Sequence, residues 1–147
     1  MLASRKDPLL GHRFLVECDG LLVAGFQEVS GLELTLEVEE VTEGGVNDLV
    51  YRLPKGLKAG NLVLKRGISR AELWEWFHQT KKALAFQEPL ETKTIYLVLL
   101  DAAGEEALRF ALSGAYPVKW TGPELKADTA SVALESLEIV YSGIERV

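Results

Sequence analysis

Residues Leu32–Val41 read LELTLEVEEV and show the clearest alternation of apolar and polar side chains in this 147-residue chain. Leucine or valine recurs at every second position along most of the stretch, and Glu33, Glu37 and Glu39 lie between them. Because successive side chains of a β-strand point to opposite faces, this period of two predicts a strand with one buried face. The other face of that strand would carry a row of carboxylates.

The segment after this strand is rich in residues that favour turns, yet it is too apolar for an idle solvent loop. It reads EGGVNDLVYRLPKG over Glu43–Gly56, with two adjacent glycines, an Asn-Asp pair and a proline. Long connections that carry apolar side chains usually cover a partner. The sequence therefore predicts a long loop over residues 42–60 that covers either another molecule or its own domain.

Short strands separated by turn signals account for most of the remaining chain. Asp19-Gly20 marks a hairpin, and Pro117 suits an edge strand or a bulge better than a central strand position. Lys93–Leu100 is apolar on both faces, so we expect it to be covered on two sides. The other expected strands are Arg13–Asp19, Leu21–Phe26, Asn61–Lys65, Glu106–Ser113, Ala115–Trp120 and Val132–Tyr141.

One segment has helical spacing. Ser69 fits a helix N-cap, and Glu72 three residues later completes a capping box. An apolar stripe follows at helical intervals, formed by Leu73, Trp76, Phe77, Thr80 and Leu84. The sequence thus predicts one domain spanning residues 1–147, of mainly β (α+β) class: an antiparallel β-sandwich or small barrel with one flanking α-helix.

Composition excludes several classes of function. No apolar run is long enough to cross a bilayer, so no membrane anchor is expected, and the N-terminus does not read as a secretory signal. The single cysteine, Cys18, rules out an internal disulfide and fits a reducing compartment. The formal net charge is −6 and lysine and arginine form no dense cluster, which disfavours sequence-specific nucleic-acid binding.

A search for chemistry finds no expected catalytic, cofactor-binding or metal site. His12 and His78 lack a second metal-type ligand at a suitable spacing, and the glycines do not form a phosphate-binding loop. Glu33, Glu37 and Glu39 share one strand face. A repeated solvent-facing row, however, lacks the difference in environment that pushes two carboxyl pKa values apart. The sequence therefore predicts a protein that is not an enzyme and needs no cofactor.

Seven motifs occur in order along nearly the whole chain, and together they are far more specific than any one of them. They are DPLLGHRFLVECDG (Asp7–Gly20), VAGFQEVSGLE (Val23–Glu33), EVEEVTEGGVNDLVYRLPKG (Glu37–Gly56), NLVLKRGIS (Asn61–Ser69), ELWEWF (Glu72–Phe77), YPVKWTGPELKA (Tyr116–Ala127) and VALESLEIVYSGIER (Val132–Arg146). In this ordered set the chain resembles the tail tube proteins of contractile bacteriophages and of phage-derived extracellular contractile injection systems.

The resemblance implies a subunit that forms rings, typically of six, which stack into a rigid hollow tube driven through a target envelope by a contractile sheath. The implied partners are further copies of the chain, sheath and baseplate proteins, and DNA or protein cargo. The subunit would be cytoplasmic before assembly and then part of a phage tail or an injection particle.

The resemblance also implies which residues make contacts. The loop at residues 42–60 and an extended N-terminal arm at residues 1–10 would touch neighbouring subunits or rings, and the row of Glu33, Glu37 and Glu39 is a hypothetical acidic lumen face. The implied contact residues are Asp7, Pro8, Leu9, Gly44, Gly45, Val46, Asn47, Leu49, Tyr51, Leu53 and Pro54.

Two other classes of function stay open at this point. A monomeric ligand-binding β-barrel would fit the mainly-β pattern and the doubly apolar strand Lys93–Leu100. A carboxylate-dependent hydrolase has only the glutamate row behind it. Rings or tubes would favour the conduit, whereas a stable monomer with a filled apolar pocket would favour the barrel.

Overall fold

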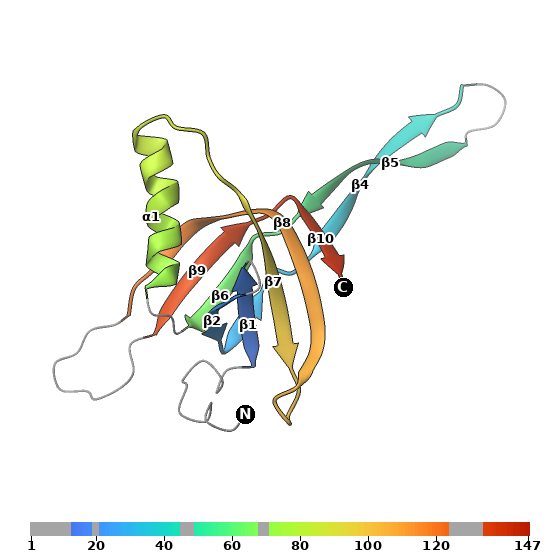
Figure 1. Cartoon of the computed structure of the whole chain (residues 1–147). Coiled ribbons are helices and arrows are strands. Elements are labelled where there is room, and N and C mark those ends of the chain that lie inside the picture. Colours follow the sequence, from blue (N-terminus) through green and yellow to red (C-terminus); the bar gives the residue numbers. More distant parts are fainter. Residues whose placement is uncertain (1–12, 19–20, 45–48, 68–70, 124–133) are drawn as a thin grey trace.

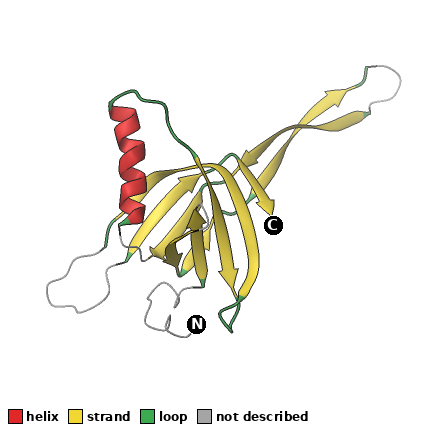
Figure 2. Cartoon of the chain, viewed as in Figure 1, coloured by secondary structure: helices red, strands yellow, loops and turns green. Residues whose placement is uncertain are grey.

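A computed structural model describes residues 13–18, 21–44, 49–67, 71–123 and 134–147. This part of the chain is mostly antiparallel strand with one helix, which confirms the expected fold class (Figures 1 and 2). In chain order the elements are β1 (Phe14–Cys18), β2 (Leu21–Phe26), β3 (Glu28–Ser30), β4 (Leu34–Thr42), β5 (Val50–Ala59), β6 (Leu62–Gly67), α1 (Glu72–Ala85), β7 (Lys93–Leu100), β8 (Glu106–Thr121), β9 (Glu135–Val140) and β10 (Gly143–Arg146).

The body of the molecule is one curled antiparallel sheet in the order β2-β1-β7-β8-β9-β6-β3, with β10 on β8. The consecutive strands β2 and β3 lie at opposite ends of this order, and the Gln27 amide between them donates to the carbonyl oxygen of Lys65 at 3.2 Å. The sheet therefore bends around the core without closing into the small barrel that was one of the two expected architectures.

Strand β8 joins the two halves of the sheet. Its first half pairs with β7 and β10, and its second half pairs with β9. The sequence predicts two strands here, but the structure has one, because Gly114 (φ +64°) and a register shift beside Pro117 bend the strand without ending it. The expected bulge at Pro117 is confirmed.

The main core fills the inside of the curl. Its fully buried side chains come from both ends of the sheet and from α1, and a second, smaller cluster lies on the other face of β1 and β7. Because both faces of β7 contribute buried side chains, the expectation that Lys93–Leu100 is covered on two sides is confirmed. The largest fully buried side chains of the main core are Phe26, Leu62, Leu64, Leu73, Ile95, Leu112, Leu137 and Ile139.

Helix α1 begins later than the sequence predicts. Its N-cap is Ala71, which has φ +113° and no capping side chain, and Glu72 is the first helical residue. The expected capping box is therefore wrong, since Glu72 would have to be the third helical residue; Ser69 itself lies outside the described residues. Acidic residues in the first turn, Glu72 and Glu75, still complement the helix dipole.

The apolar stripe of α1 is only partly covered. Leu73 is buried and Trp76, Phe77 and Thr80 are half-buried, but Leu84 is 83% exposed. Trp74 packs edge-on against Trp120 of β8 with ring centroids 4.8 Å apart. This contact attaches the helix to the sheet and supports a packing role for the helix aromatics.

Strands β4 and β5 form a separate two-stranded arm that projects from the body (Figures 1 and 2). The alternation over Leu32–Val41 correctly predicts the strand, but every residue of β4 is exposed, so the expected buried face is wrong for a single chain. The expected loop at residues 42–60 is also wrong for Val50–Ala59, which is strand β5. Pro54 is tolerated there because both strands of a ribbon are edge strands and a register shift lies beside it.

Outside the core, Arg109 ties three neighbouring strands together on the surface. Its guanidinium contacts Glu17 of β1 at 2.9 Å and Glu106 of β8 at 2.7 Å, and it lies 5.5 Å from the ring centre of Tyr96 on β7. The hydrogen bond from Arg109 lowers the pKa of Glu106 below its ordinary value, and the two carboxylates raise the pKa of Arg109.

Substitution of Gly67 by alanine tests the packing of the curl. A Cβ at Gly67 would overlap the ring of fully buried Phe26, so the ring or the backbone must move. We expect Gly67→Ala to lower the free energy of unfolding by about 1–3 kcal/mol in urea titrations. Gly56→Ala is the control, because a Cβ there meets no atom within 4 Å and should change stability by less than about 0.5 kcal/mol. Equal effects of the two changes would contradict this packing.

Substitution of Arg109 by methionine tests the surface cluster. The pKa of Glu106 is lower in the folded state than in the unfolded state. The ionised Glu106 therefore stabilises the fold at pH values above its unfolded pKa near 4.5, and this stabilisation is lost as the pH falls through the folded pKa. We expect thermal unfolding scans between about pH 6 and pH 2.5 to show a smaller acid-induced loss of stability in Arg109→Met than in the wild type. Arg52→Met is the control, because its ion pair with Glu40 is 3.6 Å long and highly exposed. An unchanged pH profile in Arg109→Met would refute the role given to Arg109.

Candidate functional site: the projecting arm

One face of the arm near its base is apolar. Leu36 lies opposite Leu57 in the antiparallel register, Leu34 lies opposite Ala59, and Val38 lies opposite Pro54. Because side chains at alternate positions share a face, these six residues form one continuous surface. Leu36 is 55% exposed, Val38 54% and Leu57 58%. We call this surface the apolar base patch.

The opposite face carries carboxylates near the base. Glu37 and Glu39 of β4 share that face, and Glu33 lies just before β4 where the arm leaves the body. All three side chains are exposed. The structure thus brings the three glutamates of the sequence analysis onto one side of the arm, while their place at a lumen stays a prediction.

Toward the tip, apolar residues also occur on the other face. Val41, Tyr51 and Leu53 lie on the same face as the glutamates, and each is exposed. On the face of the apolar base patch, Glu40 and Arg52 form an ion pair of 3.6 Å, which such exposure makes weak. Both faces of the arm therefore offer apolar surface, at different distances from the body.

The expected contact residues fall into two groups. Gly44, Leu49, Tyr51, Leu53 and Pro54 are exposed residues of the arm. The others, Asp7, Pro8, Leu9, Gly45, Val46 and Asn47, lie outside the described residues. Sequence alternation predicts a buried face formed by the leucines and valine of β4 and gives no role to Leu57. Alternation reveals that one face is apolar and does not reveal what covers it, so the apolar base patch was missed.

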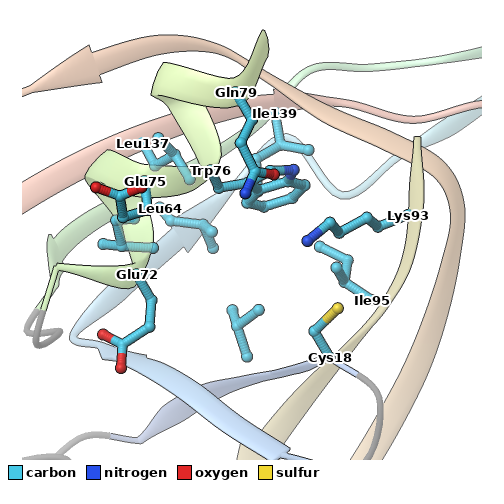
Figure 3. A pocket seen from close by; sticks show the side chains of 12 residues that line it. Cys18, Leu64, Glu72, Glu75, Trp76, Gln79, Lys93, Ile95, Leu137 and Ile139 are labelled. Carbon is cyan, nitrogen blue, oxygen red and sulfur yellow. The ribbon is translucent and has the colours of Figure 1, made fainter. Parts of the chain in front are cut away.

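A cavity of about 290 Å³ lies between α1 and the curled sheet (Figure 3). Trp76 and Gln79 reach into it from α1, and Lys93 points toward them from β7 (Figure 3). The indole Nε1 of Trp76 is buried and has no hydrogen-bond partner among the described residues. Most of the remaining lining is apolar, formed by Val16, Cys18, Leu64, Leu73, Ile95, Leu137 and Ile139. A ligand-binding function would use this cavity, whose size is at the lower end for ligand pockets.

A carboxylate-dependent hydrolase needs a carboxylic acid that keeps its proton at the working pH. Glu106 has a lowered pKa because Arg109 binds it, which opposes a role as general acid. Across residues 13–18, 21–44, 49–67, 71–123 and 134–147, no group of three or more histidine, cysteine or acidic side chains could hold a metal ion. Within the same residues, no helix has the length and apolarity needed to cross a bilayer.

Comparisons with solved structures find close folds. The chain is 30% identical to a chain in the cryo-EM structure of the anti-feeding prophage baseplate, six-fold symmetrised, covering 92% of this chain and 93% of that one with a TM-score of 0.65. It is 22% identical to a chain in the anti-feeding prophage tube-terminating cap (100% and 99% covered, TM-score 0.70). It is 23% identical to a chain in the sheath/tube terminator of the extracellular contractile injection system PVC (92% and 93% covered, TM-score 0.69).

Sequence comparison gives the family. No curated protein sequence matches the chain. Residues 10–145, almost its whole length, match the family described as T4-like virus tail tube protein gp19. Because this match covers far more than half of the sequence, the chain belongs to the T4-like virus tail tube protein family.

Proposed function

We propose that this protein assembles into rings that stack as the hollow inner tube of a contractile tail or injection machine. The exposed apolar surface of the projecting arm supports this function. Among the described residues its strands pair only with each other, and Leu36, Val38 and Leu57 of its apolar base patch are each more than half exposed. Soluble monomers rarely expose contiguous apolar surface of this kind, whereas subunits of assemblies do so routinely.

The arm also favours a repeating assembly over a closed pair. A projecting ribbon on one copy and a receiving surface elsewhere on the next make a heterologous contact, which generates rings or filaments. The strands β2 and β3, which end the described order of the sheet, offer further backbone groups for pairing between copies. Six copies per ring is the number that fits the family resemblance and the six-fold symmetry of the related baseplate.

The proposed partners follow from the same assembly. Related chains occur in baseplate, cap and sheath/tube structures, so sheath and baseplate proteins are proposed partners of this chain as well. Residues 1–10 would add a second contact between subunits. The subunit would be cytoplasmic until assembly and would carry DNA or protein cargo through its lumen afterwards, with no enzymatic step.

Leu36→Ser combined with Leu57→Ser tests the arm contact. Burying a leucine side chain contributes about 1.5–3 kcal/mol, so losing the two should raise the concentration needed for assembly by about 100-fold or more. The unfolding free energy of a single chain should change by less than about 0.5 kcal/mol, because both residues are exposed. Light scattering and negative-stain microscopy measure assembly, and urea titration measures stability.

The matched control is Leu84→Ser, which removes an exposed leucine from α1. It should assemble like the wild type if the arm makes the contact. Equal losses in both variants would mean that the apolarity of the surface matters and the arm does not. A wild-type protein that stays monomeric at every concentration, even with a baseplate, would contradict the tube itself.

Substitution of Glu33, Glu37 and Glu39 by lysine tests the proposed lumen. An acidic wall repels a polyanion and lets it pass, whereas a basic wall would retain it. We expect the triple variant to form tubes that retain DNA or acidic protein, measured by co-sedimentation at low and high salt. Tubes that form normally and retain no more cargo than the wild type would place these glutamates elsewhere, and abolished assembly would place them at a subunit contact.

The cavity under α1 supports one alternative, a monomeric ligand-binding protein. Its apolar lining and its buried indole N–H, which has no hydrogen-bond partner in the part of the chain that the structure describes, are features of ligand pockets. Native mass spectrometry of the purified protein separates the two functions, because a retained small molecule on a stable monomer favours the alternative.

A further inference from the structure

The arm meets the body at two short segments. Residues 31–33 lead from β3 into β4, and residues 60–61 lead from β5 into β6. Beyond these segments β4 and β5 pair with each other and, among the described strands, with no third one. The direction of the arm is therefore decided at its base (Figure 1).

Tyr141 connects this base to the body. Its side chain is only 6% exposed and belongs to the main core, at the junction of β9 and β10. The hydroxyl accepts a hydrogen bond from the Glu33 amide at 3.3 Å. It can donate its proton to the carbonyl oxygen of Glu33 at 3.1 Å or to that of Gly31 at 3.3 Å. One buried hydroxyl thus holds the backbone on which the arm begins.

Two glycines bring the returning chain against the same point. Gly31 has φ +83°, and a Cβ there would overlap the carbonyl oxygen of Asn61. The amide of Gly60 donates to the Glu33 carbonyl oxygen at 3.2 Å, and a Cβ on Gly60 would lie 2.7 Å from Cγ of Glu33. The two strands of the arm therefore meet at the backbone of Glu33, which Tyr141 also binds.

The chemistry of Tyr141 suits a permanent contact. Burial raises the pKa of its hydroxyl above the ordinary value, so the group keeps its proton and remains a donor. A buried hydroxyl that bonds backbone at both its donor and acceptor sites is costly to break, because its partners lose their hydrogen bonds as well.

We propose that Tyr141 is a positioning residue: its hydroxyl fixes the angle at which the arm leaves the body. Nine residues of strand span about 30 Å, so a change of about 10° at the base would move the far end of the arm by about 5 Å. A displacement of that size separates the apolar base patch from its receiving surface. The consequence for assembly rests on the proposed function, whereas the angle itself is a property of one chain.

Tyr141→Phe is the test, because it removes the hydroxyl and keeps the ring that packs in the core. Spin labels at Thr42 on the arm and Ala102 in the β7–β8 turn, in a Cys18→Ala background, report the distance between arm and body by pulsed electron resonance. Both sites are exposed. Measured below the assembly concentration, the width of the distance distribution should increase about twofold in Tyr141→Phe.

Tyr116→Phe is the matched control. Tyr116 is a half-buried tyrosine of β8 and does not contact the arm base in any described interaction. Its distance distribution should match the wild type, even if both variants lose some thermal stability. An unchanged distribution in Tyr141→Phe overturns the proposal, because a role limited to core stability would move only the unfolding temperature.

Two further measurements apply, one if Tyr141→Phe does not fold and one to relate the angle of the arm to assembly. If Tyr141→Phe does not fold, Gly60→Ala is used instead, because a Cβ at Gly60 displaces Glu33, whose backbone the Tyr141 hydroxyl binds. A shifted mean distance between the two spin labels supports the proposal, and an unchanged mean overturns it. The second measurement is the protein concentration needed for assembly. If the wild type forms tubes and Tyr141→Phe needs an about tenfold higher concentration to do so, the angle of the arm is linked to assembly. A wild type that never assembles refutes the tube, while the distance measurement still decides the role of Tyr141.

Discussion

A two-stranded ribbon has no second layer to cover its faces, and this constraint governs how the rest of the molecule is used. An isolated hairpin is marginally stable in water, and its apolar side chains gain nothing from exposure. The arm of β4 and β5 nevertheless exposes several large apolar side chains, among them Leu36, Val38 and Leu57. Unless another molecule covers this surface, it lowers the solubility of the protein and promotes aggregation. In the proposed tube, a neighbouring subunit covers this surface.

The body provides the rigidity that such an arm requires. Strand β8 runs through both halves of the sheet, so the two halves cannot move independently of it. The core inside the curl collects side chains from both ends of the sheet and from α1. Tyr141 extends that core to the base of the arm, where its hydroxyl contacts the backbone of Glu33. A force applied to the arm is therefore transmitted to the whole packed sheet.

Sequence patterns were enough for the fold class and for most strands, because alternation and turn residues act locally. They were insufficient where the decisive partner is distant. The alternation that includes Leu36 predicts a buried face, and only the three-dimensional arrangement shows that the chain itself does not cover it. Pro54 and the glycines before it indicate a loop, yet a ribbon made of two edge strands accepts a proline. The role of Tyr141 could not be read at all, since it depends on a contact with Glu33, 108 positions away in sequence.

The two faces of the arm near its base have different effects on binding: one attracts apolar surfaces, and the other restricts which surfaces can bind. The apolar base patch around Leu36 supplies attraction to any apolar surface, which by itself would promote random aggregation. Glu37 and Glu39 on the opposite face oppose that outcome, because burying an unpaired carboxylate is far more costly than burying a leucine is favourable. A receiving surface must therefore be apolar on one side and leave the glutamates in water or pair them with cations. A second copy has a net charge of −6, so its acidic surface regions do not meet the second requirement. In the proposed assembly, the distribution of apolar and acidic side chains along this ribbon would therefore restrict which surfaces the arm can bind.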